Sequence, residues 1–281
     1  ILHLTGNPVE LMVSPTTPKE QMEILSEQMG FNDPLPEQYI RFLKGVLVGD
    51  FGTSYYYNEP ALSVVLERAP ATLSLACAAL VICILLGVPA GILSAVKRNK
   101  LSDAIIRVLA LLGECMPAFW LGIMLIILFA VKLRWLPTGG ADEGLRSIIL
   151  PAFTLGLFSA ATICRLLRSN MIEVLGKEYI DVCRAKGLPA RKIITKHALK
   201  NALSSIITML GMQFASLIGG SVITETVFGW PGVGRLVGQS ITSSDFAVVE
   251  CIVFLMAVVF VVINFVVDVL YCVINPRVRL Q

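Results

Sequence analysis

The chain has 281 residues, of which 56% are hydrophobic and only 15% are charged, and its mean hydropathy is +0.77. A soluble domain of this length does not need so much apolar sequence, so the composition excludes an ordinary soluble protein. Apolar runs of roughly 20 residues, the length that crosses a hydrocarbon core as a helix, recur along the chain. We therefore predict a polytopic all-α membrane protein, in which the distribution of charge matters more than the net charge of +3.

The residue types that carry catalysis or bind metals form no recognisable set. The histidines are His3 and His197, and no nucleophile–base set, metal-ligand spacing or Cys-x-x-Cys pair is present. GxxxxGK[ST] is also absent, so this chain alone has no Walker-type ATP site. Most of the seven cysteines lie in apolar runs and are predicted to be small buried apolar residues. They are Cys77, Cys83, Cys115, Cys164, Cys183, Cys251 and Cys272.

The first part of the chain is polar and turn-rich. Ile1-Leu2-His3-Leu4 resembles the end of an apolar run, so we expect a spanning helix before Ile1. Residues 5–69 carry nine acidic against four basic side chains, with helical patterns around 18–29 and 36–48. We predict that residues 1–69 hold the end of that helix and an extracytoplasmic segment, and that 70–281 form the transmembrane domain.

Five spanning segments are predicted after this region, at 70–96, 104–131, 148–167, 202–223 and 247–274. Pro89 and Pro117 interrupt two of them and are expected to bend the helices. Small residues in segment 202–223 are predicted to let neighbouring backbones approach closely. They are Gly211, Ala215, Ser216, Gly219, Gly220 and Ser221.

Charges in the linkers predict one orientation. Linker 97–107, linker 168–200 and the tail 275–279 are basic and are placed in the cytoplasm, whereas 132–147 and 224–246 are mixed or acidic and are placed outside. Arg165 and Arg168, at the cytoplasmic end of segment 148–167, are expected to extend towards the membrane surface. Counting back, the N-terminus would also be cytoplasmic.

The most informative stretch is the basic island 178–201. Residues 165–200 hold nine Lys or Arg against three Asp or Glu. Apolar residues at helical spacing stand on both sides of Gly187-Leu188-Pro189, a sequence that favours a turn followed by a new helix. The pattern predicts a helix–turn–helix that a soluble partner grips. The alternative is a basic loop that obeys the positive-inside rule without a partner.

This island resembles the "EAA" cytoplasmic loop of permease subunits in ATP-binding-cassette importers. Asp181-Val182-Cys183 stands where that motif has Glu-Ala-Ala, and Gly187 is its glycine. The dipeptide/oligopeptide/nickel branch is matched along essentially the whole chain, and within it this chain resembles the B-type permease. The matching stretches include Arg184-Ala185-Lys186-Gly187-Leu188, Gly49-Asp50-Phe51-Gly52-Thr53-Ser54, Pro70-Ala71-Thr72-Leu73, Trp135-Leu136-Pro137, Trp230-Pro231-Gly232 and Asn275-Pro276-Arg277.

Two positions depart from the family pattern. Ser204-Ser205-Ile206 stands where a proline often follows the loop, so the next helix is expected to be less kinked. Glu114 stands where relatives usually carry small or apolar residues, which places an ionisable group near a bend. An intramembrane carboxylate usually faces a cavity or a partner. Glu114 is therefore predicted to line the pathway; the alternatives are that it pairs with a Lys or Arg of the partner subunit or lies close enough to the interface to stay hydrated.

The resemblance implies three groups of site residues. The ATPase-coupling group is Tyr179, Asp181, Arg184, Ala185, Lys186, Gly187, Leu188 and Arg191. The translocation-path group is Glu114, Met116, Pro117, Trp120, Gln213 and Gly220. The group at the outer mouth, where a binding protein docks, is Asp50, Glu225, Trp230 and Arg235. Ordinary structural roles remain open for several of them: Trp230 as an interfacial anchor, Gln213 as a link between helices and 49–54 as a structural turn.

The predicted function is the permease of an ATP-driven importer of short peptides in a prokaryotic inner membrane. The resemblance implies three kinds of protein partner: a second permease, two cytoplasmic ATPases that use ATP and Mg, and an extracytoplasmic solute-binding protein. The chain itself is predicted to bind no cofactor, metal or nucleic acid and to have no enzyme activity. The alternative cargo is nickel or a metal chelate. An ATP-independent channel or secondary transporter fits less well, because it has no use for a docking helix pair. A membrane enzyme would require a catalytic set of residues that the sequence does not show.

Overall fold

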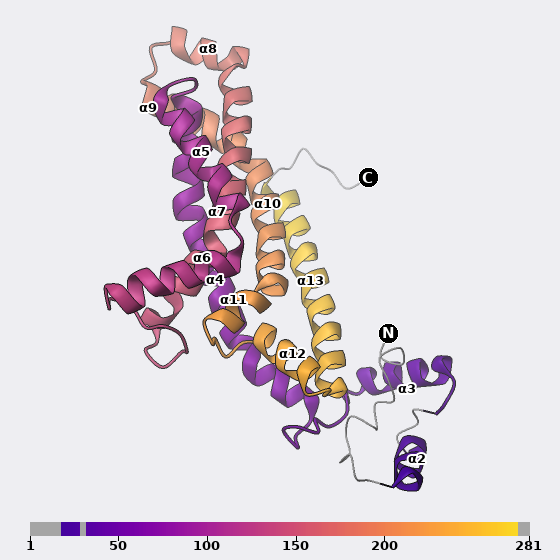
Figure 1. The fold of residues 1–281 in the computed structure, drawn as a ribbon. Coiled ribbons are helices and arrows are strands. Elements are labelled where there is room, and N and C mark those ends of the chain that lie inside the picture. Colours follow the sequence, from indigo (N-terminus) through magenta and orange to yellow (C-terminus); the bar gives the residue numbers. More distant parts are fainter. Residues whose placement is uncertain (1–17, 29–31, 275–281) are drawn as a thin grey trace. The chain divides into compact units, whose positions relative to one another are not determined.

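The computed structural model describes residues 18–28 and 32–274, and within them the chain is almost entirely helical (Figure 1). The predicted end of a spanning helix at 1–4 lies outside the described residues. The helices are α2 (Lys19–Gln28), α3 (Leu35–Leu47), α4 (Ala61–Val96), α5 (Leu101–Cys115), α6 (Ala118–Leu125), η2 (Ile126–Lys132), α7 (Leu145–Leu175), α8 (Glu178–Ala185), α9 (Ala190–Lys192), η3 (Ile193–Ala198), α10 (Leu199–Gly220), α11 (Val222–Val227), α12 (Val233–Thr242) and α13 (Phe246–Ile274).

Three helices are long and apolar enough to cross a membrane on their own, namely α4, α7 and α13. The count rises to five if two bent pairs each form one span: Leu101–Cys115 with Ala118–Lys132, and Ala190–Leu203 with Ile206–Gly220. The all-α membrane architecture is thus confirmed. Two predicted spans were too short, because α4 begins at Ala61 and α7 continues to Leu175.

The two prolines behave differently. At Pro117 the chain bends by 103° between α5 and α6, since Pro117 has an extended backbone and no N–H to continue the helix. Segment 104–131 is therefore a broken helix with a sharp turn, rather than one helix with a modest bend. In contrast, α4 runs without a break through Pro89.

Contact density divides the chain into two compact units. Unit 1 comprises Ile1–Pro70 with Leu236–Leu255, and unit 2 comprises Ala71–Arg235 with Met256–Gln281. In unit 1, Phe42, Phe51 and Phe254 form an aromatic cluster with ring centroids 5.6 to 6.3 Å apart. The buried Ser54 hydroxyl donates a hydrogen bond to Asp245, and burial, with the Asp245 charge, raises the pKa of the Tyr55 phenol.

Unit 2 contains the helices that matter most for function. Within it, α8 and α9 lie at one end of α7 and α10, and α11 lies at the opposite end of α10 (Figure 1). One apolar core, near α8, joins residues of α4, α7, α8, η3 and α10. A second core joins α4, α7 and α10 with Trp230. The same three long helices therefore run through both cores.

The packing of α4 against α7 depends on glycines. A Cβ at Gly87 would lie 2.8 Å from the Ala160 carbonyl oxygen, and one at Gly156 would lie 2.6 Å from that of Ala79. Gly87 and Gly91 form a Gly-x-x-x-Gly pair, a pattern that lets helix backbones meet in lipid. The predicted close approach at segment 202–223 occurs only in part. Gly211 abuts Val267, but a Cβ at Gly219 or Gly220 would meet nothing within 4 Å.

Gly156→Val should destabilise unit 2. The new side chain would force α7 away from the Ala79 carbonyl and Ile82, and overpacking of this kind costs about 1–3 kcal/mol. Gly219→Val is the matched control, because the same side chain would enter open space. Thermal unfolding of the purified protein measures the difference, and equal midpoints for the two variants would contradict this account of the α4–α7 contact.

Candidate translocation cavity and coupling helices

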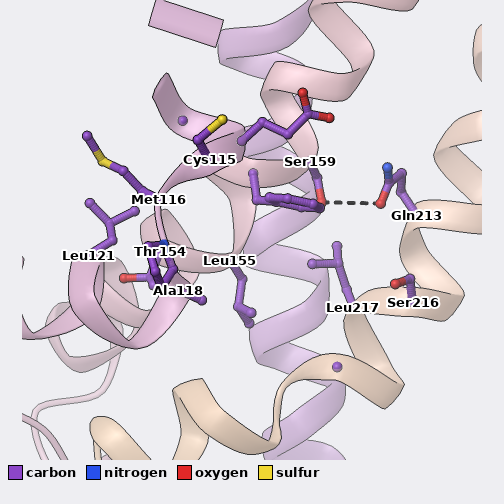
Figure 2. A pocket seen from close by; sticks show the side chains of 15 residues that line it. Cys115, Met116, Ala118, Leu121, Thr154, Leu155, Ser159, Gln213, Ser216 and Leu217 are labelled. Carbon is purple, nitrogen blue, oxygen red and sulfur yellow. Dashed lines mark hydrogen bonds between the residues drawn. The ribbon is translucent and has the colours of Figure 1, made fainter. Parts of the chain in front are cut away.

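A cavity of about 410 Å³ lies in unit 2 where the α5–α6 break faces α7 and α10 (Figure 2). Most of its wall is apolar, and its polar groups come from a few side chains. Ser159 of α7 and Gln213 of α10 point towards each other, and the Ser159 hydroxyl donates to Gln213 Oε1 at 3.4 Å. The lining residues are Gly113, Glu114, Cys115, Met116, Pro117, Ala118, Leu121, Thr154, Leu155, Phe158, Ser159, Gln213, Ser216, Leu217 and Gly220.

The cavity brings together most of the predicted path residues. Glu114, Met116, Pro117, Gln213 and Gly220 all line it. Trp120 does not: its side chain is exposed on α6 and outside the cavity lining. Gly113, Glu114 and Cys115 belong to the end of α5, and Pro117 and Ala118 follow at the 103° break, so the break itself forms part of the cavity wall.

Glu114 pairs within its own chain. Its Oε1 accepts from Arg165 Nη2 at 2.6 Å, and the Thr162 hydroxyl stands 3.5 Å from the same oxygen. The pair is partly open, because 23% of the Glu114 side chain and 49% of the Arg165 side chain are exposed. Arg165 thus has an ion-pair partner that the sequence analysis did not predict, and its extension towards the membrane surface stays a prediction.

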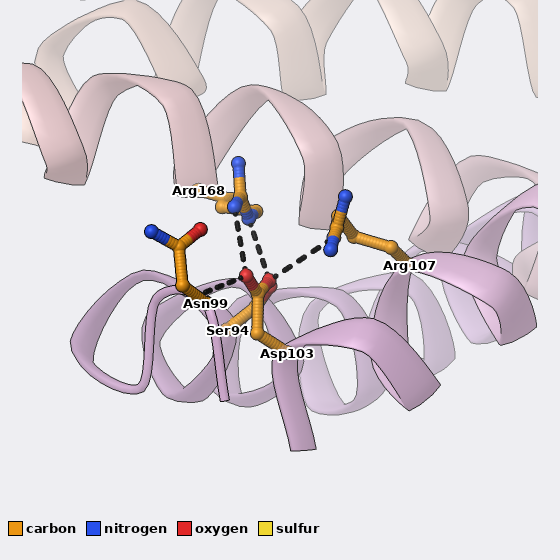
Figure 3. Close-up of polar contacts among 5 residues, drawn as sticks. All are labelled: Ser94, Asn99, Asp103, Arg107 and Arg168. Carbon is orange, nitrogen blue, oxygen red and sulfur yellow. Dashed lines mark hydrogen bonds and ion pairs between the residues drawn. The ribbon is translucent and has the colours of Figure 1, made fainter. Parts of the chain in front are cut away.

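Asp103 is the centre of a buried polar network that the sequence analysis missed (Figure 3). Arg168 contacts both carboxylate oxygens, with Nε 2.8 Å from Oδ1 and Nη2 2.9 Å from Oδ2. The Ser94 hydroxyl donates to Oδ1 at 2.6 Å, and the Asn99 amide donates to Oδ2 at 2.9 Å. Arg107 Nε lies 3.4 Å from Oδ1. This network joins the end of α4, the 97–100 turn, α5 and α7.

Glu225 organises the loop that precedes the last helix. Its side chain is fully buried. Its Oε1 accepts from the hydroxyls of Thr72 at 2.8 Å and Ser221 at 2.7 Å, and its Oε2 accepts from the Arg235 amide at 2.9 Å. The Val233 amide donates to the Thr72 hydroxyl in turn. The carboxylate thus holds α4, α11 and the start of α12 together.

The predicted docking residues have different environments. Glu225 and Trp230 are buried, and the Trp230 indole donates to the Ala71 carbonyl at 2.8 Å, so neither presents its side chain to a docking protein in this structure. Arg235 donates to the Gly229 carbonyl at 2.7 Å and is half-buried. Asp50 is exposed, and its carboxylate accepts from the Gly52 amide in a local turn.

The basic island forms the predicted helix–turn–helix. Helix α8 ends at Ala185, Gly187 adopts a φ of +73°, and Pro189 precedes α9, which continues into η3. A side chain at Gly187 would meet nothing within 4 Å. The turn therefore needs glycine for its backbone conformation rather than for space.

The two faces of the island differ in chemistry. Ile180, Ile193 and Ala198 are buried in the core that also contains parts of α4, α7 and α10, with Leu188 packed against it. The opposite face is exposed and carries most of the predicted coupling residues. These are Tyr179, Asp181, Arg184, Ala185, Lys186, Gly187 and Arg191. Of these, Arg184 pairs with Asp181 at 2.7 Å, and the Tyr179 hydroxyl accepts from Asn201 at 2.9 Å.

The architecture and the site define a class: a polytopic helical transport subunit with a cavity between its helices and a charged, exposed helical hairpin at one end. Among the described residues no group of three or more His, Cys, Asp or Glu side chains could hold a metal ion.

The chain belongs to the family of binding-protein-dependent transport system inner membrane components, the permeases of ATP-binding-cassette importers. This family matches residues 87–280, and the N-terminal domain of the same transport system membrane components matches residues 2–76. The family resemblance seen in the sequence is thus confirmed, and the chain is a multi-pass inner-membrane protein.

Several relatives align over nearly their whole length. The glutathione transport system permease protein GsiC of Escherichia coli (strain K12) is 39% identical over 276 residues, covering 98% of this chain and 90% of the relative. The protein of the same description from Salmonella paratyphi A (strain ATCC 9150 / SARB42) is 40% identical over the same coverage.

Two solved structures share the fold. An inward-facing structure of the MetNI methionine ABC transporter has a TM-score of 0.65 and 19% identity, covering 76% of this chain and 97% of that chain. A crystal structure of an amino acid ABC transporter with histidines has a TM-score of 0.57 and 17% identity, covering 77% and 94%. The fold of an importer permease is confirmed.

Asp103→Asn should destabilise the protein strongly. Removing one partner of a buried ion pair leaves Arg168 without its counter-charge, at a cost of about 3 kcal/mol. Glu173→Gln is the control, because Glu173 lies on the same helix as Arg168 but its ion pair with Lys177 is largely exposed and contributes less than about 1 kcal/mol. Similar unfolding midpoints for the two variants would show that the Asp103 network is dispensable.

Glu225→Gln should loosen the segment between α11 and α12. The new amide group would face the Arg235 N–H, donor against donor, and the Val233–Thr72–Glu225 chain would weaken. Amide hydrogen exchange at Val233 and Arg235 should then accelerate roughly tenfold, as expected for about 1.4 kcal/mol of local stability. Glu143→Gln, at an exposed glutamate of linker 132–147, should leave both rates unchanged. Unchanged rates in Glu225→Gln would refute the organising role.

Proposed function

We propose that this permease carries short peptides, and that α8 and η3 transmit movements of cytoplasmic ATPases to its cavity. The observation that carries this proposal is the double role of the island. One face is exposed and charged, and the other is part of the same apolar core as α4, α7 and α10. A partner that displaces α8 must therefore displace the ends of the helices that line the cavity.

The proposed mechanism is alternating access driven through that core. Closure of the ATPases would push on Arg184, Lys186 and Arg191, whose charges suit an acidic rim, and the push would pass through Ile180 and Ile193 to α7 and α10. Because α7 and α10 supply Ser159 and Gln213 to the cavity, the motion would change its width. Packed cores transmit such shifts well since they deform little.

The cargo assignment draws on the relatives and on the cavity. The relatives at 39–40% identity are described as glutathione permeases, and glutathione is a tripeptide. The cavity offers both apolar surface, at Leu155 and Leu217, and hydrogen-bonding groups, at Ser159 and Gln213. Peptides present both kinds of surface, which supports a short-peptide cargo.

The remaining parts of the complex follow from the family. We propose a second permease beside this chain, two ATPases that bind ATP and Mg on the cytoplasmic side, and an extracytoplasmic binding protein. In this orientation α8 and the C-terminus face the cytoplasm, and residues 5–69 face outward. The basic linkers support this orientation.

The cargo can be tested in proteoliposomes that contain the complete complex and its binding protein. Short peptides should stimulate ATP hydrolysis and accumulate inside the vesicles, whereas nickel and nickel–chelate complexes should do neither. Stimulation by the metal complexes alone would replace the peptide assignment with the alternative cargo.

Gly187 tests the coupling role. Gly187→Val should uncouple ATP hydrolysis from uptake, because a β-branched residue at φ +73° is strained and would reshape the turn. Gly187→Asn is the matched control, since asparagine tolerates this conformation and the site has room for a side chain. We expect Gly187→Asn to retain coupled uptake and Gly187→Val to lose most of it.

The opposite result is equally informative. If Gly187→Val assembles with the ATPases and still couples hydrolysis to uptake, the island does not transmit the movement.

A further inference from the structure

The Glu114–Arg165 pair stands at one end of the cavity. Glu114 is the one charged residue in the cavity lining, among the described residues. Arg165 does not itself line the cavity; it lies seven residues after the lining residue Phe158 on α7, and so on the same face of that helix. The two charges therefore meet beside the cavity, on the face of α7 that carries Phe158.

Several hydrogen-bonding groups of Glu114 and Arg165 are left unpaired by their contact with each other. One hydrogen bond joins Arg165 Nη2 to Glu114 Oε1. Within the described part of the chain, no hydrogen bond or ion pair reaches Glu114 Oε2 or the Nε and Nη1 groups of Arg165. Both side chains are partly exposed. An acceptor and two donors are therefore available to a ligand.

The Asp103–Arg168 pair shows what a structural pair looks like on the same helix. Its arginine binds the carboxylate through two nitrogens, the carboxylate has further donors from Ser94 and Asn99, and the Asp103 side chain has 0% exposure. Nothing is left for a ligand to contact. The open geometry at Glu114 is thus not a general property of ion pairs in this protein.

A short peptide brings two charges into a cavity with mainly apolar walls. Its ammonium and carboxylate lose hydration there, and a buried charge is costly unless it is paired and hydrogen-bonded. A carboxylate with a free oxygen and a guanidinium with free donors supply one counter-charge for each end. Charge-assisted hydrogen bonds of this kind are the stronger ones in proteins.

We propose that Glu114 and Arg165 recognise the charged ends of the peptide, Glu114 binding the ammonium and Arg165 the carboxylate. The two side chains separate as the peptide enters, and they pair again after it leaves. This inference rests on the proposed peptide function and adds a residue-level basis for cargo selection within the permease.

The test measures peptide binding to the assembled permease–ATPase complex in nanodiscs. The binding protein is left out, so that the peptide can be recognised only by the membrane complex. The probes are trialanine, N-acetyl-trialanine and trialanine amide, and affinities come from ligand-observed NMR titration. In the wild type, blocking either end should weaken binding roughly tenfold, the effect of losing one charge-assisted hydrogen bond.

The variants separate recognition from a structural role. Glu114→Gln should bind trialanine and its N-acetyl form equally, while still discriminating against the amide. Arg165→Gln should bind trialanine and its amide equally, while still discriminating against the N-acetyl form. Glu173→Gln, which breaks an exposed ion pair elsewhere on α7, should keep both wild-type ratios. A purely structural role would weaken all three peptides together and leave the ratios unchanged.

Two results would overturn the inference: wild-type ratios in both cavity variants, or no detectable binding of trialanine to the wild type. Neither would by itself overturn the proposed function, which depends on peptide-stimulated hydrolysis and uptake with the binding protein present. If that assay also fails for peptides, the proposed function fails as well.

Discussion

The apolar core that joins α8 and η3 to α4, α7 and α10 is the constraint on which the rest of the structure depends. Ile180 and Ile193 are buried in it, so the island is packed against the long helices instead of hanging from a flexible loop. The glycine contacts at Gly87 and Gly156 bring α4 and α7 together along their length. In the proposed mechanism, a displacement at the charged face of α8 is therefore transmitted as a movement of α7 and α10, which both line the cavity.

Three carboxylates of unit 2, those of Asp103, Glu225 and Glu114, differ in how completely their oxygens are hydrogen-bonded. Asp103 and Glu225 are buried and fully hydrogen-bonded, one in the network with α7 and the other in the loop before the last helix. Both join segments far apart in the sequence. Glu114, by contrast, keeps a free oxygen and faces the cavity. Completeness of pairing thus distinguishes Asp103 and Glu225 from Glu114, to which we assign a ligand-binding role.

The sequence predicted what local patterns determine. The spanning segments follow from apolar length, and the turn of the island follows from Gly187-Leu188-Pro189. It failed where a partner is distant: Asp103 and Arg168 are 65 residues apart, and nothing near Asp103 indicates that Arg168 covers it. The resemblance placed Glu225 at the outer mouth, but it gave no sign that Thr72, 153 residues away, helps to bury the Glu225 side chain. The bend angle at Pro117 also depends on tertiary packing, since proline alone permits a range of angles.

The central claim is that the island moves as one body with α7 while the cavity changes. Distances between pairs of spin labels, attached to cysteines introduced into a cysteine-depleted protein, test this claim directly. One pair of labels stands on Val182 of α8 and Glu173 of α7, and a second pair stands across the cavity on Cys115 and Ser216. Between the nucleotide-free and ATP-trapped complex, the first distance should stay constant and the second should change. A changing first distance with a constant second one would show that α8 moves without the cavity, and would contradict the account.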